Sequence, residues 1–422
     1  MLLQFNFKNF KSFRDDTTLD MTATKISEYE KHVVHVGGEQ VLPIAAIFGA
    51  NASGKSNVIE AFRYMHEYVI FSLNYGGDAP KKERDGFVRP TPFIFDSNSK
   101  DAESFFEVYF TDETDTKEKT YNYGFTIDSE GVIEEWLNVK AKTAKESTKV
   151  FYRNRKTDEL DLSGFTNKVK DNLAIALEKE TLLVSLGSKL KVEKLKFVRD
   201  WFLKNEFTDF GKPIENYFLS NLVPDNFATD ENVRKKVVDY LSAFDNSIVD
   251  FKVEILPGDT EDEEKLKIDA VHKMVDGNGF ASISLQQESA GTLKMFALYP
   301  WVNDILQSGG VLVVDELNAK LHPLLVRVFT QTFLNKELNP NNAQLIFTTH
   351  DSWQLNANLL RRDEIWFTEK QDNGISQLYS LADFVDEDGA KIRKDENYEK
   401  NYLLGKYGAI PTLKYFDLFK EE

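Results

Sequence analysis

The chain has 422 residues, a formal net charge of −17 at pH 7 and no cysteine. The lack of cysteine excludes disulfides, thiolate chemistry and cysteine-built zinc sites, and the acidic balance argues against a nucleic-acid protein driven by bulk electrostatics. The length predicts one elaborated domain or two lobes. Because the first residues lack a signal-peptide pattern and no apolar run approaches the roughly 20 residues of a membrane span, we expect a cytoplasmic protein without a membrane partner.

A phosphate-binding loop is predicted near the N-terminus. Residues 1–8 alternate like a β-strand, and an apolar run at 42–48 leads into Gly-Ala-Asn-Ala-Ser-Gly-Lys-Ser at 49–56 and then into a helix-like segment. A strand, a G-x-x-x-x-G-K-S loop and a helix in this order form the context that a P-loop needs. We therefore expect a nucleoside triphosphate here, its phosphates facing the loop N–H groups and the helix N-terminus.

The residues of this loop have separate expected roles. Lys55 would reach the β- and γ-phosphates and assist catalysis, and Ser56 would supply a hydroxyl ligand to Mg²⁺. The predicted nucleotide-binding residues of the loop are Gly49, Asn51, Ser53, Gly54, Lys55, Ser56 and Asn57.

Composition divides the chain into three parts. Residues 1–140 hold the opening strand, the P-loop and a strand-rich stretch that includes 105–110. Residues 141–270 are richer in Lys, Glu and Leu at helical spacing, which predicts a mostly helical insertion. An acidic segment at 257–264 is predicted to be an exposed loop. Residues 271–422 return to short apolar strands that alternate with helices.

A local basic segment lies within the middle part, between residues 189 and 204. Its cations alternate with apolar residues such as Leu195 and Val198, which is typical of the solvated face of an amphipathic helix. A contact with nucleic acid or with a protein partner is the alternative interpretation. The cations are Lys189, Lys191, Lys194, Lys196, Arg199 and Lys204.

Two apolar strands in the last part are predicted to end in functional residues. Residues 309–316 read Gly-Gly-Val-Leu-Val-Val-Asp-Glu, a run that suits a buried parallel strand. Ligands bind at the C-terminal ends of strands in open α/β sheets, so we expect Asp315 to hold Mg²⁺ and Glu316 to orient or deprotonate the attacking water. A third strand at 344–349 ends at His350, which would contact a γ-phosphate or be satisfied by backbone.

This order of P-loop, Asp-Glu strand and strand ending in His resembles the ABC-type ATPases. About 260 residues separate the P-loop lysine from the Asp-Glu pair, so an insertion interrupts the sheet, as in the SMC, RecF and OLD branches. Residues 7–13 are similar to the opening strand of RecF- and SMC-like heads. The segment 289–292, Ser-Ala-Gly-Thr, looks like the ABC signature, in which Ser289 and Gly291 would cap the γ-phosphate held by the opposite subunit. Residues 318–322 fall where the family's D-loop crosses the dimer interface.

Further segments resemble a bacterial branch, the stand-alone AAA/ABC-type ATP-binding proteins of defence and abortive-infection loci such as RloA, the AbiL ATPase and the PARIS ATPase AriA. The resemblance implies an α/β fold, an ABC-type P-loop ATPase head whose mixed sheet has flanking helices and carries the insertion. It also implies ATP and Mg²⁺ as cofactors, a homodimer or higher oligomer, and a separate effector protein, a nuclease or toxin. The segments are 321–323, 347–351, 361–367 and 402–411.

One family feature is absent from the sequence. ABC ATPases usually carry a Q-loop glutamine between the P-loop helix and the signature helix, yet no glutamine occurs between Gln40 and Gln286. Asp96 and Asn98 lie in a plausible place for a replacement. A structural turn is an equally good interpretation of those two residues.

Three functions are compatible with the sequence. The leading hypothesis is an ATP-dependent sensor or scaffold of an anti-phage defence system, in which two heads sandwich ATP and control the effector. An OLD-like nuclease is disfavoured, because it would need a metal-dependent TOPRIM domain, and the about 72 residues after His350 are too few for that domain and the closing strands of the sheet. The clearest acidic cluster among them, 386–389, suits a solvated turn. A genome-maintenance ATPase of RecF or SMC type acting on DNA is weakened by the acidic balance. The sequence thus allows a nucleic-acid partner without requiring one.

Overall fold

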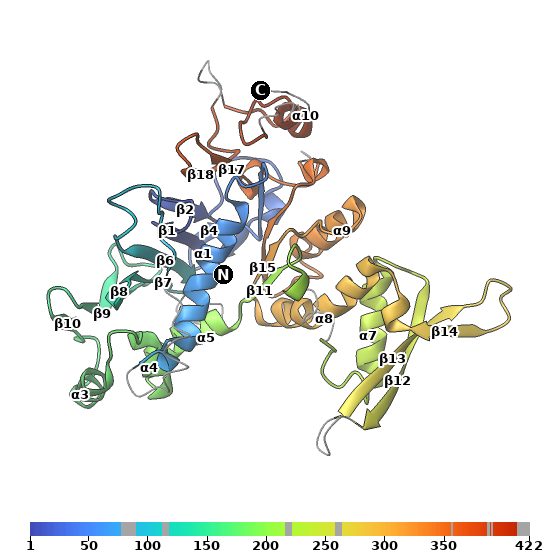
Figure 1. The fold of residues 1–422 in the computed structure, drawn as a ribbon, viewed down its shortest axis with the longest axis horizontal. Coiled ribbons are helices and arrows are strands. Elements are labelled where there is room, and N and C mark those ends of the chain that lie inside the picture. The colour runs from blue at the N-terminus through green and yellow to red at the C-terminus, as the bar shows by residue number, and fades with distance from the viewer. Residues whose placement is uncertain are drawn as a thin grey trace, which may run out of the picture.

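The protein folds as a mixed α/β structure, seen here in a computed structural model that describes residues 1–76, 90–111, 118–215, 222–257, 264–355, 358–385, 389 and 391–411. Two sheets flank one long helix, and a smaller sheet projects to one side (Figure 1). The expected α/β class with a parallel sheet is confirmed. Within the described ranges, no helix is long and apolar enough to cross a membrane.

The first sheet is antiparallel and has the strand order β10-β9-β8-β7-β6-β1-β2. Alternate side chains of its strands point to opposite faces, and the buried face packs on helix α1 (Lys55–Phe71), where the rings of Phe5 and Phe62 lie 4.9 Å apart. The opening strand and the strand-rich stretch are confirmed. The strands are β1 (Leu2–Lys8), β2 (Thr17–Asp20), β6 (Ser104–Thr111), β7 (Thr120–Asp128), β8 (Gly131–Lys140), β9 (Thr148–Asn154) and β10 (Glu159–Asp161).

The second sheet is the core of the fold and has the order β11-β15-β16-β5-β17-β18. Its first five strands are parallel, and β18 runs antiparallel to β17. The C-terminal ends of the parallel strands therefore meet along one edge, which is where ligands bind in such sheets. The strands are β11 (Glu206–Asp209), β15 (Val311–Asp315), β16 (Gln344–Thr348), β5 (Ile44–Gly49), β17 (Ile365–Lys370) and β18 (Ser376–Ser380).

The core sheet is buried on both faces, which explains its continuous apolar runs. Alternate residues of one strand enter different hydrophobic clusters. In β5, Ala45 and Ile47 face α1 and the first sheet, whereas Ala46 and Phe48 face helices α8 (Ala290–Ser308) and α9 (Pro323–Leu334) on the other side. A single strand thus joins two cores, and the P-loop leaves from its end.

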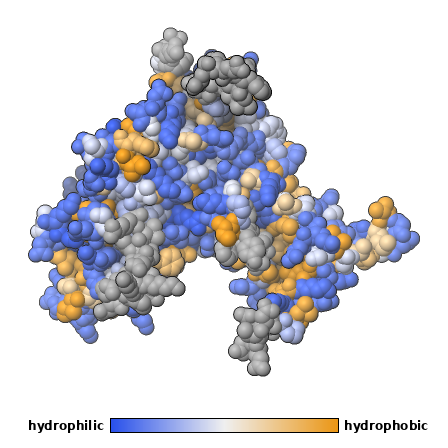
Figure 2. Space-filling model, in the orientation of Figure 1, coloured by the Kyte–Doolittle hydropathy of each residue, from blue (hydrophilic) through white to orange (hydrophobic). Residues whose placement is uncertain are grey.

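A projecting arm is formed by helix α7 (Glu231–Ser242) and an antiparallel sheet of β12 (Ile248–Pro257), β13 (Glu264–Lys273) and β14 (Phe280–Ser284) (Figure 1). One face of this sheet packs on the arm's own helix and on α8. Exposed hydrophobic side chains gather on its outer hairpin (Figure 2). The chain passes directly from this sheet into the signature-like segment and α8.

The prediction of a mostly helical insertion at 141–270 needs correction. Those residues do form helices, but they also supply β9 and β10 to the first sheet, β11 to the core sheet, and β12 with most of β13 to the arm. Pairing with distant strands overrides the local helical spacing. Most of the acidic segment at 257–264 lies outside the described residues. The helices of this part are α3 (Asn167–Ala176), α4 (Leu183–Lys189), α5 (Glu193–Leu203) and α7.

The remaining strands and the last helix lie toward the two ends of the chain. A hairpin precedes the P-loop strand, and a short helix follows the core sheet near the C-terminus. Several single-turn helices connect the larger elements. These elements are β3 (Val34–Val36), β4 (Glu39–Val41) and α10 (Tyr398–Leu403), and the turns are Glu30–His32, Ser72–Asn74, Leu285–Gln287, Ser352–Gln354 and Arg362–Glu364.

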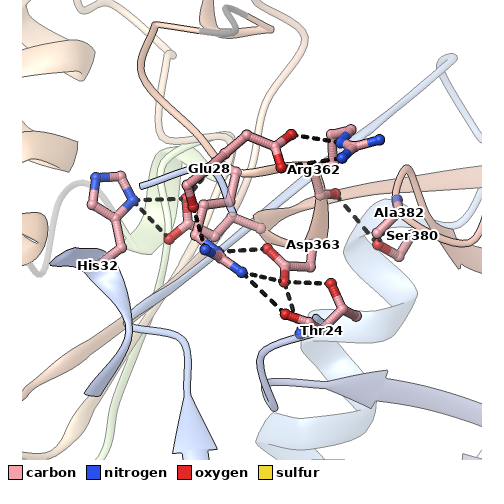
Figure 3. A network of polar contacts seen from close by, with 9 residues as sticks. Thr24, Glu28, His32, Arg362, Asp363, Ser380 and Ala382 are labelled. Carbon is pink, nitrogen blue, oxygen red and sulfur yellow. Dashed lines mark hydrogen bonds and ion pairs between the residues drawn. The ribbon is translucent and has the colours of Figure 1, made fainter. Parts of the chain in front are cut away.

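A buried polar network joins the N-terminal segment to the start of β17 (Figure 3). The guanidinium of Arg361, 1% exposed, donates to both carboxylate oxygens of Asp363 at 2.9 Å and also to the backbone oxygens of Thr24 and Glu28. Thr24 donates its N–H and its hydroxyl to the same Asp363 carboxylate. The segment 361–367, which carries part of the resemblance, therefore has a structural role.

Candidate functional site

The P-loop adopts a backbone conformation that requires glycine at two positions. Gly54 precedes α1 with φ of 115°, and a Cβ there would lie 2.7 Å from the hydroxyl oxygen of Ser376. A Cβ on Gly49, at the end of β5, would lie 2.5 Å from the backbone oxygen of Thr368. Such contacts and a positive φ exclude other residues, so these glycines let the loop lie against β17 and β18.

Hydroxyl groups from β17, β18 and the segment after β1 contact the loop and the start of α1. The hydroxyls of Ser53 and Thr368 are 2.6 Å apart, and Ser376 donates its hydroxyl to the backbone oxygen of Ser53 at 2.7 Å. The side-chain amide of Asn57 donates to the hydroxyl of Ser12 at 2.7 Å. The sequence did not single out Ser12, Thr368 or Ser376, because no motif marks a residue that reaches the loop from another strand.

Lys55 is buried, with 5% of its side chain exposed, and its Nζ donates to the backbone oxygens of Gly49 and Ala50 at 2.9 Å. Burial lowers the pKa of Lys55 to about 8, although the charges of Asp315 and Glu316 oppose this shift. A desolvated ammonium group beside a helix N-terminus is suited to a phosphate anion. The loop therefore fits the triphosphate group predicted for it.

The Asp-Glu strand and the His strand reach the same place. Asp315 is almost fully buried and accepts a hydrogen bond from the hydroxyl of Thr348, which in turn accepts the N–H of Glu316 at 2.8 Å. Burial raises the pKa of Asp315, while hydrogen bonds from Thr348 and Ser56 oppose the rise. Ser56 and Asp315, the two predicted Mg²⁺ ligands, are thus in hydrogen-bond contact, which is compatible with a shared cation.

Glu316 and His350 lie side by side at the edge of the core sheet. His350 Nε2 is 3.6 Å from Glu316 Oε1, and each side chain is about one-third exposed. Burial, and then the charge of Lys55, lower the pKa of His350, whereas Glu316 opposes them. We therefore expect a neutral imidazole near pH 7. The backbone N–H of His350 donates to Asn318 at 3.3 Å, so its position depends on the D-loop-like segment.

A pocket of about 820 Å³ collects most of the predicted residues. Gly49, Ser53 and the metal-ligand candidate Asp315 are not among its lining residues. Ser53 and Asp315 are both buried. Lys370, at the end of β17, lines the pocket too and carries no sequence signal. The lining residues are Asn51, Ala52, Gly54, Lys55, Ser56, Asn57, Glu316, His350 and Lys370.

The signature-like residues do not line this pocket. The hydroxyl of Ser289 accepts the N–H of Thr292 at 3.1 Å and caps α8. Gly291 lies against the D-loop-like segment, where a Cβ would come 3.4 Å from the backbone oxygen of Lys320. Lys294, further along α8, donates to the backbone oxygen of Ala319 at 2.8 Å. The signature helix and this segment are therefore joined within one chain.

The expected replacements for the missing glutamine are not at the site. The carboxylate of Asp96 accepts the N–H and hydroxyl of Ser99 at 2.9 and 2.7 Å, so a turn is the correct interpretation. Neither Asp96 nor Asn98 lines the pocket. Besides Thr348 and Ser56, the fold brings the acidic residue Asp209 opposite Asp315 across the β11–β15 pair, and, after burial, its charge helps to raise the pKa of Asp315. Asp209 belongs to the middle part, where composition predicted helices.

The structure bears on the basic segment considered for nucleic-acid binding. In the basic segment, Lys194 donates to the backbone oxygen of Gly164, Lys196 pairs with Asp200, and Arg199 donates to the backbone oxygen of Ile70. These partners favour a solvated amphipathic helix over a nucleic-acid surface. The acidic residues 386–388 of the cluster considered for a nuclease lie outside the described residues.

One family model, described as "AAA domain, putative AbiEii toxin, Type IV TA system", matches residues 44–352. The matched stretch contains the P-loop, the Asp315–Glu316 pair and His350. No curated protein matches the chain. Because the model spans well over half of the sequence, this protein belongs to that AAA domain family, a P-loop ATPase family linked to toxin and defence loci.

Proposed function

We propose that the protein is an ABC-type ATPase that binds and hydrolyses ATP at a dimer interface and controls a separate effector, a nuclease or toxin, in an anti-phage defence system. The convergence of Lys55, Glu316 and His350 on one pocket supports the ATPase. The family description supports the defence role, since it refers to a toxin of a type IV toxin–antitoxin system.

The expected chemistry is phosphoryl transfer to water. Ser56 and Asp315 would hold Mg²⁺, which when bound would supply positive charge that stabilises the transferred phosphate. Lys55 would contact the transferred phosphate. Glu316 would orient water and accept its proton, and the neutral His350 beside it would donate a hydrogen bond to the γ-phosphate.

A second subunit is needed in this proposal. Ser289 and Gly291 do not line the pocket of their own chain, and a serine and glycine at a helix N-terminus suit an anion that another copy presents. The partners are thus a second copy of the chain and the effector.

The solution mass of Glu316→Gln protein tests the dimer. Light scattering with Mg-ATP is expected to report twice the mass seen without nucleotide, because this variant should hold ATP without consuming it. The double variant Lys55→Ala/Glu316→Gln should keep the nucleotide-free mass in both conditions. A monomer that hydrolyses ATP at a rate per molecule independent of protein concentration would contradict the proposal.

The pKa of Lys55 makes a second prediction. Because burial lowers this pKa to about 8 in the free protein and a bound triphosphate stabilises the charged form, affinity for ATP should be constant below about pH 8. Above that value the dissociation constant should rise about tenfold per pH unit. Fluorescence titrations with a non-hydrolysable analogue measure it.

Arginine at position 55 provides the control for this titration. Arg stays protonated throughout the range, so Lys55→Arg protein that still binds nucleotide should show no loss between about pH 8 and pH 9.5. An affinity of the wild type that stays constant over the same range would mean that Lys55 does not titrate in the free protein.

A further inference from the structure

The segment that leaves β11 lies beside the catalytic edge of the core sheet. β11 pairs with β15 in parallel, with Asp209 opposite Asp315. The pairing continues past the end of β11, since the N–H of Phe210 donates to the backbone oxygen of Asp315 at 2.9 Å. The next residue, Gly211, is therefore held next to Glu316.

The carboxylate of Glu316 occupies the space that a side chain at position 211 would need. A Cβ on Gly211 would lie 2.7 Å from Oε2 and 2.9 Å from Cδ of Glu316. The φ of Gly211 is not in the left-handed region, so its backbone conformation does not require glycine. The two closest atoms belong to Glu316, and the next, Oδ1 of Asp209, would lie 3.1 Å away. On the other side of this carboxylate, His350 Nε2 lies 3.6 Å from Oε1.

The position of Gly211 is set by several contacts. Its N–H donates to the carboxylate of Asp209 at 2.8 Å. Lys212 pairs with Asp209 at 3.1 Å, and Glu215 pairs at 2.8 Å with Arg63 of α1, the helix that begins at the P-loop. The backbone that meets Glu316 is thereby tied to the element that carries Lys55.

We propose that Gly211 is a positioning residue for hydrolysis: its missing side chain creates the space in which the Glu316 carboxylate lies beside His350. The inference rests on the proposed ATPase function and deepens it. An added methyl group at position 211 would displace the flexible end of the Glu316 side chain rather than backbone atoms. The fold would therefore tolerate the change, but the carboxylate that acts as general base would leave its position beside His350.

The test compares steady-state ATP hydrolysis by wild type and Gly211→Ala protein. We expect kcat to fall at least about tenfold, because small displacements of a reacting group are costly, while the KM for ATP and the melting temperature stay near the wild-type values. Gly76→Ala is the matched control. Its Cβ would also meet the end of a glutamate, Glu178 Oε2 at 2.3 Å, but outside the pocket, and kcat should not change.

A double-mutant cycle identifies the path of the effect. Glu316→Asp shortens the side chain and removes the collision, so adding Gly211→Ala in that background should change kcat little. An unchanged kcat in Gly211→Ala protein, or an equal loss in both backgrounds, would overturn the inference and leave the ATPase in place. A Glu316→Gln variant as active as wild type would also overturn the inference, because Glu316 would then not activate the water. A wild type without ATP hydrolysis would overturn the proposed function and the inference with it.

Discussion

Replacing Glu316 by glutamine is expected to slow ATP hydrolysis by about 10²- to 10⁴-fold, the contribution of a positioned general base, while ATP stays bound. Glutamine keeps the size of the side chain but does not accept a proton from water. Lys55 and Ser56, which would hold the phosphates and the metal, are unchanged. Phosphate release under saturating Mg-ATP and the nucleotide retained after gel filtration measure the two effects.

Two further variants distinguish a loss of ATP hydrolysis from a loss of ATP binding. Lys55→Ala should lose ATP binding itself, since it removes the buried ammonium group that faces the pocket. Glu159→Gln changes an exposed carboxylate on edge strand β10 and should leave both measurements at wild-type values. Hydrolysis by Glu316→Gln protein at the wild-type rate would show that another group activates the water.

Replacing Arg361 by alanine is expected to lower the free energy of unfolding by about 3–5 kcal/mol. The variant leaves the carboxylate of Asp363 buried without a cation. An unpaired buried charge lowers stability by more than the ion pair itself contributes to it. It also removes the hydrogen bonds to the backbone of Thr24 and Glu28 that hold the N-terminal segment (Figure 3). Urea unfolding followed by tryptophan fluorescence measures the loss.

Arg393 provides a matched control for this prediction. It has the same spacing to its partner as Arg361 and pairs with Asp395 at 3.0 Å, but the two side chains are 76% and 63% exposed. Because solvent screens such a pair, Arg393→Ala should change stability little. An equal, small loss in both variants would show that the network of Arg361 does not hold the N-terminal segment to β17.

The sequence indicated the parts of the site that lie within one continuous segment. The P-loop is such a part, because the residues that give its backbone shape and those that contact phosphate occupy eight consecutive positions. Asp315, Glu316 and His350 were found for a similar reason. Each follows a short apolar run, and buried parallel strands present their C-terminal residues at one edge. The structure brings Lys55, Glu316 and His350 to one pocket, as expected.

The sequence was misleading where strand pairing decides the structure. Helical spacing dominated residues 141–270, so β11 was not predicted, and with it Asp209 and Gly211 were missed. Asp96 was considered for the missing glutamine because of its place along the chain, yet its carboxylate completes a local turn. Periodicity reports which residues face a core, and it does not report which distant strand lies beside them.

The sequence by itself determined the local chemistry, namely the P-loop, the acidic strand end and the His strand, because short-range motifs encode backbone shape and side-chain type together. Tertiary structure alone decided what surrounds that chemistry. Thr368 and Ser376 support the P-loop from more than 300 positions away, and Ser12 does so from 45 positions away. Gly211, just after the unpredicted strand β11, leaves room for Glu316. Such contacts depend on which strands become neighbours, and this follows from the packing of the whole chain.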